Sequence, residues 1–178
     1  SVIMPTYNAA HWVAESIDSI LSQTYSNWEL IITDDCSTDN TRDILKTYEQ
    51  KDQRIKIIYA ETNLGAGHAR NNCIEHAQGR YIAFCDSDDR WMPQKLEKQL
   101  AFMQEKDCCM AYASYITCNE HGENTGVIIA PKRQNLFQTK CDDKIGFLTC
   151  IYDTYKTGGK MYMPVQRKRQ DYAYVLQI

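Results

Sequence analysis

Residues 81–89 of this chain read Tyr81-Ile-Ala-Phe-Cys-Asp-Ser-Asp-Asp89. The apolar run predicts an interior strand of an α/β sheet, and such sheets bind ligands at the loops that follow the carboxyl ends of their strands. The spacing of Asp86 and Asp88 around Ser87 lets both carboxylates approach one hard cation, Mg²⁺ or Mn²⁺. Because these ions share their coordination shell with substrate phosphates, the stretch suggests metal-bridged diphosphate chemistry. The alternative is a solvated, Asp-rich turn.

Length and composition fit one soluble globular domain. The 178 residues are 43% hydrophobic and 24% charged, which allows a sizeable core. A net charge of −3 predicts no general attraction to nucleic acid. No apolar run approaches the roughly 20 residues of a membrane span, and the N-terminus lacks the charged-then-apolar layout of a signal peptide. We therefore expect a cytoplasmic protein that does not bind nucleic acid.

The eight cysteines are scattered along the chain and form no Cys-x-x-Cys pair. Several lie inside apolar, strand-like runs, as the reduced core cysteines of cytosolic proteins do. Cys108 and Cys109 would point to opposite sides of a strand, and the histidines at positions 68, 76 and 121 add no ligand spacing. These patterns favour packed thiols over disulfides or a structural zinc site.

Strand-like and helix-like apolar periods alternate along the chain. Gly79 suits the C-terminal cap of the third helix, and Asp39 or Ser37 can cap the second at its start. Four β-α units in succession predict right-handed crossovers and a doubly wound, mostly parallel α/β sheet with helices on both faces. We expect strands at 1–4, 28–33, 54–59, 81–85, 110–117 and 127–130, and helices with apolar positions at 13–21, 44–48, 66–77 and 96–103.

Three loops follow strands of this expected sheet and should converge on one crevice. They are residues 5–8 (Pro-Thr-Tyr-Asn), residues 34–39 (Asp-Asp-Cys-Ser-Thr-Asp) and the Asp86 cluster. Tyr7 offers a ring for stacking on a nucleobase, and Asp35 offers an acceptor for a base or ribose donor. Alternatively, Tyr7 is a packed core residue and residues 34–39 form an Asx turn that caps the next helix.

From Pro131 onward the charge changes sign. Nine cationic residues face three anionic ones between Pro131 and Gln170. The stretch from Lys156 to Arg169 could dock an anionic acceptor or a membrane surface, or it could be a solvated face. Residues 171–178 have apolar positions at helical spacing and predict a final helix.

Five segments resemble the family 2 glycosyltransferases, which have the GT-A fold. The resemblance spans essentially the whole chain, and five motifs in the right order are highly specific. The segments are Val2-Ile-Met-Pro-Thr-Tyr-Asn8, Asp34-Asp-Cys-Ser-Thr-Asp-Asn-Thr41, Asn63-Leu-Gly-Ala-Gly-His-Ala-Arg-Asn71, Gly79-Arg-Tyr-Ile-Ala-Phe-Cys-Asp-Ser-Asp-Asp89 and Arg169-Gln-Asp-Tyr172.

The resemblance implies transfer of a sugar, with inversion, from a nucleotide-diphospho-sugar to a hydroxyl acceptor. It implies a Mn²⁺ or Mg²⁺ cofactor and a donor that we expect to be a UDP-sugar. Position by position, it implies five roles. Pro5, Thr6 and Tyr7 would line the nucleobase pocket, Asp35 would hydrogen-bond the base, Arg70, Asp86 and Ser87 would contact the nucleotide, and Asp88, with Asp86, would hold the metal; Asp171 would be the catalytic base.

The resemblance also implies a division of the chain. Residues 1–178 would form one GT-A catalytic domain, with a nucleotide-sugar-binding half at 1–90 and an acceptor and catalytic half at 91–178. Many relatives continue well past the base, so we expect the chain to be truncated at its C-terminus. Residues 145–169 resemble a bacterial subgroup that assembles surface polysaccharides such as capsule, O-antigen or exopolysaccharide. This implies a saccharide or lipid-linked saccharide acceptor and peripheral contact with the inner membrane face.

Rival functions remain at this point. A Rossmann dehydrogenase would show Gly-x-Gly-x-x-Gly after its first strand, where this chain has residues 5–8 instead. A sugar nucleotidyltransferase would carry a Gly-rich loop with Arg and Lys near its start, which is not seen. A non-catalytic nucleotide-sugar-binding module would keep the donor site without performing transfer.

Overall fold

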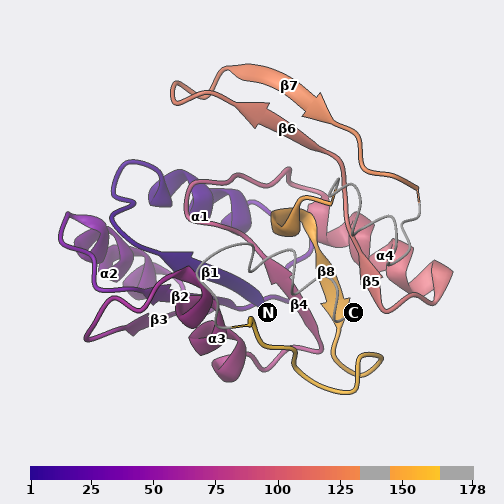
Figure 1. Ribbon diagram of the computed structural model, residues 1–178, viewed down its shortest axis with the longest axis horizontal. Coiled ribbons are helices and arrows are strands. Elements are labelled where there is room, and N and C mark those ends of the chain that lie inside the picture. The colour runs from indigo at the N-terminus through magenta and orange to yellow at the C-terminus, as the bar shows by residue number, and fades with distance from the viewer. Residues whose placement is uncertain (133–144, 165–178) are drawn as a thin grey trace.

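The computed structural model describes residues 1–132 and 145–164. Helices and strands alternate over the first part of the chain (Figure 1). The elements are β1 (Val2–Thr6), α1 (Val13–Leu21), β2 (Leu30–Asp34), α2 (Thr41–Lys51), β3 (Ile55–Tyr59), α3 (Ala66–His76), β4 (Tyr81–Phe84), α4 (Lys95–Lys106), β5 (Met110–Ala111), β6 (Tyr115–Cys118), β7 (Asn124–Ile128), the 3₁₀ helix η1 (Phe147–Thr149) and β8 (Ile151–Asp153).

Six strands form one sheet in the order β3-β2-β1-β4-β8-β5. β1 pairs in parallel with both β2 and β4, and β2 pairs in parallel with β3. β8 runs antiparallel between β4 and β5. The expected doubly wound, mostly parallel sheet is therefore confirmed, with one antiparallel strand that the sequence pattern did not indicate.

Alternation along the strands divides the core into two layers. Val2 and Met4 of β1 pack in a cluster with α1, α2 and α4, whereas Ile3 packs in a second cluster with α3 and η1. Helices thus cover both faces of the sheet (Figure 1). Each fully buried aliphatic side chain of this kind contributes about 1.5–3 kcal/mol. Burial on both faces explains why β1 and β2 read as continuous apolar runs.

The expected strand at 110–117 is wrong in its extent. Only β5 joins the main sheet, and the chain leaves the sheet before β6, which pairs with β7 in a separate hairpin (Figure 1). The Ala113 N–H donates to Thr149 Oγ1 at 3.2 Å, and the ring of Tyr115 packs over Gly146, where a Cβ would lie 2.6 Å from the ring. These contacts with the η1 segment pull the chain off the edge of the sheet. Every residue of β7 is exposed.

The expected caps have mixed outcomes. Asp39 Oδ1 accepts the N–H of Thr41, the first residue of α2, at 3.0 Å, whereas Ser37 Oγ accepts the Asn8 N–H instead. Gly79 does not cap α3, which ends at His76 with an extended Ala77. Position 79 requires glycine for another reason, since a Cβ there would lie 2.6 Å from the Ser1 nitrogen.

The cysteines within the described ranges are all free thiols, as expected. Cys73 and Cys85 are fully buried in the two core layers. Burial raises the pKa of Cys73 to about 11, so this thiol stays protonated and unreactive at neutral pH. Packing is the role of these residues.

An ion pair fastens the antiparallel strand to its neighbour. Arg80 donates from Nε and Nη2 to the two oxygens of Asp153, at 2.9 and 2.6 Å, and the Asp153 side chain is only 2% exposed. These hydrogen bonds from Arg80 hold the pKa of Asp153 below its ordinary value, although burial opposes them. The pair joins the residue before β4 to the last residue of β8.

Arg80→Ala should lower the free energy of unfolding at pH 7 by about 1–3 kcal/mol, because a buried carboxylate loses its charged partner. Since the folded-state pKa lies below the ordinary value of about 3.9, the stabilisation is complete above that value and is lost as the pH falls through the folded-state pKa. Urea unfolding should show that the free energies of unfolding of the variant and the wild type differ less at pH 3 than at pH 7. Arg90→Ala, which removes an exposed pair with Glu15, should cost under about 1 kcal/mol. Equal losses in both variants would contradict this account.

Candidate functional site

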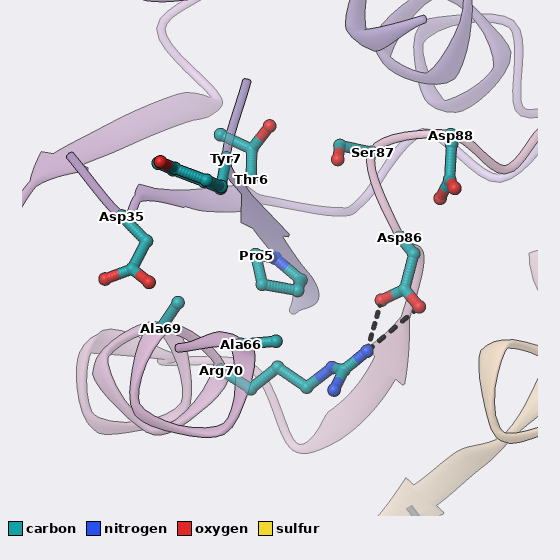
Figure 2. A pocket seen from close by; sticks show the side chains of 10 residues that line it. All are labelled: Pro5, Thr6, Tyr7, Asp35, Ala66, Ala69, Arg70, Asp86, Ser87 and Asp88. Carbon is teal, nitrogen blue, oxygen red and sulfur yellow. Dashed lines mark hydrogen bonds and ion pairs between the residues drawn. The ribbon is translucent and has the colours of Figure 1, made fainter. Parts of the chain in front are cut away.

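The three loops predicted to converge do meet, at an open pocket of about 190 Å³. The pocket lies at the carboxyl ends of β1, β2 and β4, and α3 forms its fourth side (Figure 2). Every donor-site and metal-site residue expected from the sequence lies on its wall. The lining residues are Pro5, Thr6, Tyr7, Asp35, Ala66, Ala69, Arg70, Asp86, Ser87 and Asp88.

The pocket has two chemically different ends (Figure 2). Tyr7 and Asp35 lie at one end, and Asp86 and Asp88 lie at the other, with Pro5 between them. Tyr7 is 50% exposed, so it is not the packed core residue of the alternative interpretation. One end therefore offers an aromatic ring and an acceptor, and the other offers carboxylates.

The first two loops are fastened to each other by hydrogen bonds. Asn8 has a positive φ of 49°, which turns its side chain so that Oδ1 accepts the Thr38 N–H at 2.8 Å. The Ala9 N–H donates to Thr41 Oγ1 at 2.8 Å, and the Ala10 N–H donates to Asp39 Oδ2 at 3.1 Å. Asp39 thus forms an Asx turn with the first residue of α2, although the N-cap of that helix is Asn40, which makes no side-chain capping bond. Asp35 of the same loop lines the pocket.

Asp35 is 4% exposed and holds the loop that leads into α3. Its Oδ1 accepts the Leu64 N–H at 3.0 Å and its Oδ2 accepts the Gly65 N–H at 2.7 Å. Gly65 has a φ of +91°, a conformation that favours glycine. Each carboxylate oxygen can accept a further hydrogen bond, so Asp35 can orient this loop and still face a ligand.

Arg70 and Asp86 form the ion pair at the acidic end (Figure 2). Arg70 Nη2 donates to Asp86 Oδ1 at 2.7 Å and to Oδ2 at 2.9 Å, and the Arg70 side chain is 7% exposed. Its guanidinium lies 5.4 Å from the centre of the Phe147 ring, so η1 supports it from behind. The arginine fixes the direction of Asp86 and balances its charge.

Negative charge concentrates on the loop after β4. Asp88 is exposed, and Asp89 is partly buried beside it. Burial, followed by the charges of Asp86 and Asp88, raises the pKa of Asp89 to about 7, while Arg70 opposes this. An incoming cation would lower the electrostatic energy of this loop.

The carboxylate oxygens of this end fit a hard divalent cation that completes its coordination shell with oxygens of a bound ligand. Two carboxylates, Asp86 and Asp88, face the pocket (Figure 2). Within residues 1–132 and 145–164, no group of three or more His, Cys, Asp or Glu side chains could enclose an ion. Mg²⁺ and Mn²⁺ accept such open sites, because they keep several waters and bind substrate phosphates.

Ala66 and Ala69 line the pocket but were not identified from the sequence. Both project from the first turn and a half of α3, and Ala69 is only 1% exposed. Small side chains carry no chemical signature, so only their place after the loop at Asn63–Gly65 could have indicated them.

Three expected features lie wholly or partly outside the described residues: the base Asp171, the final helix at 171–178 and part of the basic stretch. Positions 167–169 belong to that part of the basic stretch. In the described part of that stretch, Lys156 pairs with Asp107, and Lys160 donates to the Glu75 carbonyl at 2.7 Å. These two lysines are therefore already engaged within the protein.

Comparison with known proteins agrees with this geometry. A family model described as "Glycosyl transferase family 2" matches residues 1–162. The putative teichuronic acid biosynthesis glycosyltransferase TuaG of Bacillus subtilis is 46% identical over 174 residues, which are 97% of this chain and 69% of TuaG. The UDP-Glc:alpha-D-GlcNAc-diphosphoundecaprenol beta-1,3-glucosyltransferase WfgD of Escherichia coli is 42% identical over 86% of this chain and 59% of its own length.

A solved structure shares the fold. Residues 1–349 of TarS from S. aureus superpose with a TM-score of 0.77 at 25% identity, covering 99% of this chain and 53% of that one. The same protein in complex with UDP-GlcNAc gives a TM-score of 0.76 at 26% identity. The chain thus spans about half of this structural relative.

Asp35→Asn should loosen the loop before α3, because an amide nitrogen cannot accept the Leu64 or Gly65 N–H that the carboxylate accepts. We expect the free energy of unfolding to fall by about 1–3 kcal/mol, the cost of leaving a buried donor unsatisfied. Amide hydrogen exchange should accelerate at Leu64 and Gly65 more than in β2 itself. Unchanged exchange at these two amides would show that Asp35 does not hold the loop.

Proposed function

Because the chain belongs to glycosyltransferase family 2 and has the GT-A fold, we propose that its pocket binds the nucleoside diphosphate part of a sugar donor. As a member of this family the protein is a glycosyltransferase. The observation that carries the proposal is the pairing of an aromatic and acceptor end with a carboxylate end in one pocket. The base would stack on Tyr7 and hydrogen-bond Asp35, and the diphosphate would lie beside Asp86 and Asp88.

The proposed donor is a UDP-sugar. TarS has been solved with UDP-GlcNAc, and the name of WfgD specifies UDP-Glc. In this chain, Asp35 presents carboxylate oxygens, which can accept a base N–H, beside the exposed ring of Tyr7. The Asp35 carboxylate can accept the N3–H of uracil, and since guanine and adenine also carry N–H donors, the choice of uridine is supported by these two relatives.

We propose Asp88 as the direct metal ligand, with Asp86 sharing its charge between the metal and Arg70. When bound, Mn²⁺ or Mg²⁺ would supply Lewis-acid neutralisation of the charge that grows on the departing diphosphate. Arg70 keeps Asp86 pointing into the pocket through its two hydrogen bonds. Ser87, between the two acids, is held against α1 because its carbonyl accepts a hydrogen bond from Ser16 Oγ at 2.9 Å.

The proposed reaction is a direct displacement with inversion. An acceptor hydroxyl attacks the anomeric carbon, its proton passes to Asp171, and the nucleoside diphosphate leaves from the opposite face. No covalent nucleophile is needed for a single displacement. Residues 1–90 would serve as the donor-binding half and residues 91–178 as the acceptor and catalytic half of one domain.

The proposed acceptor is a saccharide of a bacterial surface polysaccharide, free or lipid-linked. The names of TuaG and WfgD specify teichuronic acid biosynthesis and a diphosphoundecaprenol-linked sugar. In the described part of the chain, no helix has both the length and the hydropathy that crossing a bilayer requires. We propose a cytoplasmic location with peripheral contact at the inner membrane face, which salt-dependent sedimentation with anionic vesicles tests.

The two other candidate functions have less support. A sugar nucleotidyltransferase and a non-catalytic binding module would share the donor pocket, but the named relatives are glycosyltransferases. Transfer of sugar, or slow hydrolysis of the donor, by the full-length protein would separate an enzyme from a binding module.

Asp88→Ala should abolish the Mn²⁺-dependent part of nucleotide binding and leave the fold intact, because Asp88 is exposed. The measurement is a thermal-shift panel of UDP, GDP and ADP with and without Mn²⁺. A nucleotide at a concentration of a hundred times its Kd stabilises the wild type by about 2.7 kcal/mol. The gain that Mn²⁺ adds should disappear in the variant. Asp43→Ala, which removes an exposed acid of α2, is the matched control. An unchanged Mn²⁺ gain in Asp88→Ala would reject the assignment.

Asp171→Asn should preserve donor and metal binding but lower the transfer rate by about 10²–10⁴-fold, because the amide keeps the shape and loses the proton acceptor. The measurement is single-turnover transfer by the full-length protein alongside donor affinity. Near wild-type transfer would place the base elsewhere, and lost donor binding would point to a structural role.

A further inference from the structure

Arg42 lies outside the pocket but contacts the backbone that builds it. It belongs to the first turn of α2, and its Nε donates to Asp34 Oδ2 at 2.6 Å. Its Nη2 donates to the Ala60 carbonyl at 3.1 Å, and its guanidinium lies 5.6 Å from the centre of the Tyr59 ring. One side chain therefore joins the end of β2 to the end of β3 and the loop that follows it.

Asp34 depends on this arginine. The Asp34 side chain is fully buried, and its Oδ2 accepts Arg42 and, at 3.2 Å, the Ser37 N–H. Its other oxygen is buried and has no hydrogen-bond partner within the described residues. A buried carboxylate is costly unless it is paired, so loss of Arg42 would leave this acid with a single backbone donor.

The loop at residues 60–65 is fastened at both ends by neighbouring acids. At its start, the Ala60 N–H donates to the Asp34 carbonyl at 2.9 Å, and the Ala60 carbonyl accepts Arg42. At its end, Leu64 and Gly65 donate to the Asp35 carboxylate. The same loop leads directly into α3, whose first residues line the pocket.

We infer that Arg42 is a positioning residue for the nucleobase end of the donor pocket. The inference rests on the proposed function, since it takes that pocket to be the donor site. Arg42 acts through Asp34 and Ala60 and does not touch the nucleotide. Without Arg42, Ala60 and Asp34 lose the side chain that joins them. Asp35 follows Asp34 directly, so its carboxylate is then no longer held in one position.

The test compares three variants with wild type. Arg42→Ala removes the anchor, whereas Arg42→Lys keeps the charge but lacks the planar fork that reaches Asp34 and Ala60 together. Arg54→Ala is the matched control: Arg54 also pairs with an aspartate, Asp52, and stacks on an aromatic ring, that of Trp28, but at the opposite end of β3. The readouts are UDP and GDP affinities by calorimetry and amide exchange at Leu64 and Gly65 without nucleotide.

Arg42→Ala should weaken UDP binding by about tenfold, the effect of one lost charged hydrogen bond, and should lower the preference for UDP over GDP. Arg42→Lys should fall between it and wild type. Arg54→Ala should stay within about twofold of wild type in both measurements, even if it melts earlier. Exchange at Leu64 and Gly65 should accelerate in Arg42→Ala and not in Arg54→Ala.

Wild-type affinity and wild-type exchange in Arg42→Ala would overturn the inference, and so would equal losses in Arg54→Ala. If Arg42→Ala does not fold, Arg42→Lys decides by the same two readouts. If wild type binds no nucleotide, the proposed function fails, but the exchange measurement still decides the role of Arg42. Accelerated exchange then supports the anchor, and unchanged exchange refutes it.

Discussion

The position of β1 between β2 and β4 is the constraint on which the rest of the structure depends. All three strands run parallel, and the chain moves outward from β1 to β2 and β3 before it crosses back to β4. Right-handed crossovers then place α1 and α2 on one face and α3 on the other. The loops that follow β1 and β4 consequently diverge at their carboxyl ends, which opens the crevice that the pocket occupies.

Three of the acids in or beside this crevice have defined structural partners. Asp34 and Asp35 are consecutive, yet one binds Arg42 on the α2 side and the other holds the loop before α3. Asp86 is held by Arg70, and Asp88 is left exposed. Carboxylates that would repel one another in isolation are thus separated by backbone N–H groups and arginines. The remaining unbalanced charge, near Asp88, lies where a cation and a diphosphate would complete the site.

The sequence indicated more of the site than of its supports. Periodicity and the loops after strands identified Tyr7, Asp35, Asp86 and Asp88, because polar residues that interrupt apolar runs stand out. The other four predicted pocket residues, Pro5, Thr6, Arg70 and Ser87, came from the resemblance to the family 2 glycosyltransferases. The sequence did not indicate β8, because a strand of three residues is too short to show a period-2 pattern and its pairing partner β4 is distant in the sequence. Ala66 and Ala69 were missed because small side chains have no chemical signal. The pair of Arg42 and Asp34 was missed because it depends on the turn that brings the start of α2 back to β2.

A structure of this chain with UDP and Mn²⁺ would test the central claim most directly. The account predicts that the uracil stacks against Tyr7 and is hydrogen-bonded to Asp35. The diphosphate and the metal should lie beside Asp88, and the Asp86 carboxylate should bind Arg70, the metal or both. A nucleotide bound in the opposite direction, or one bound away from these residues, would contradict it.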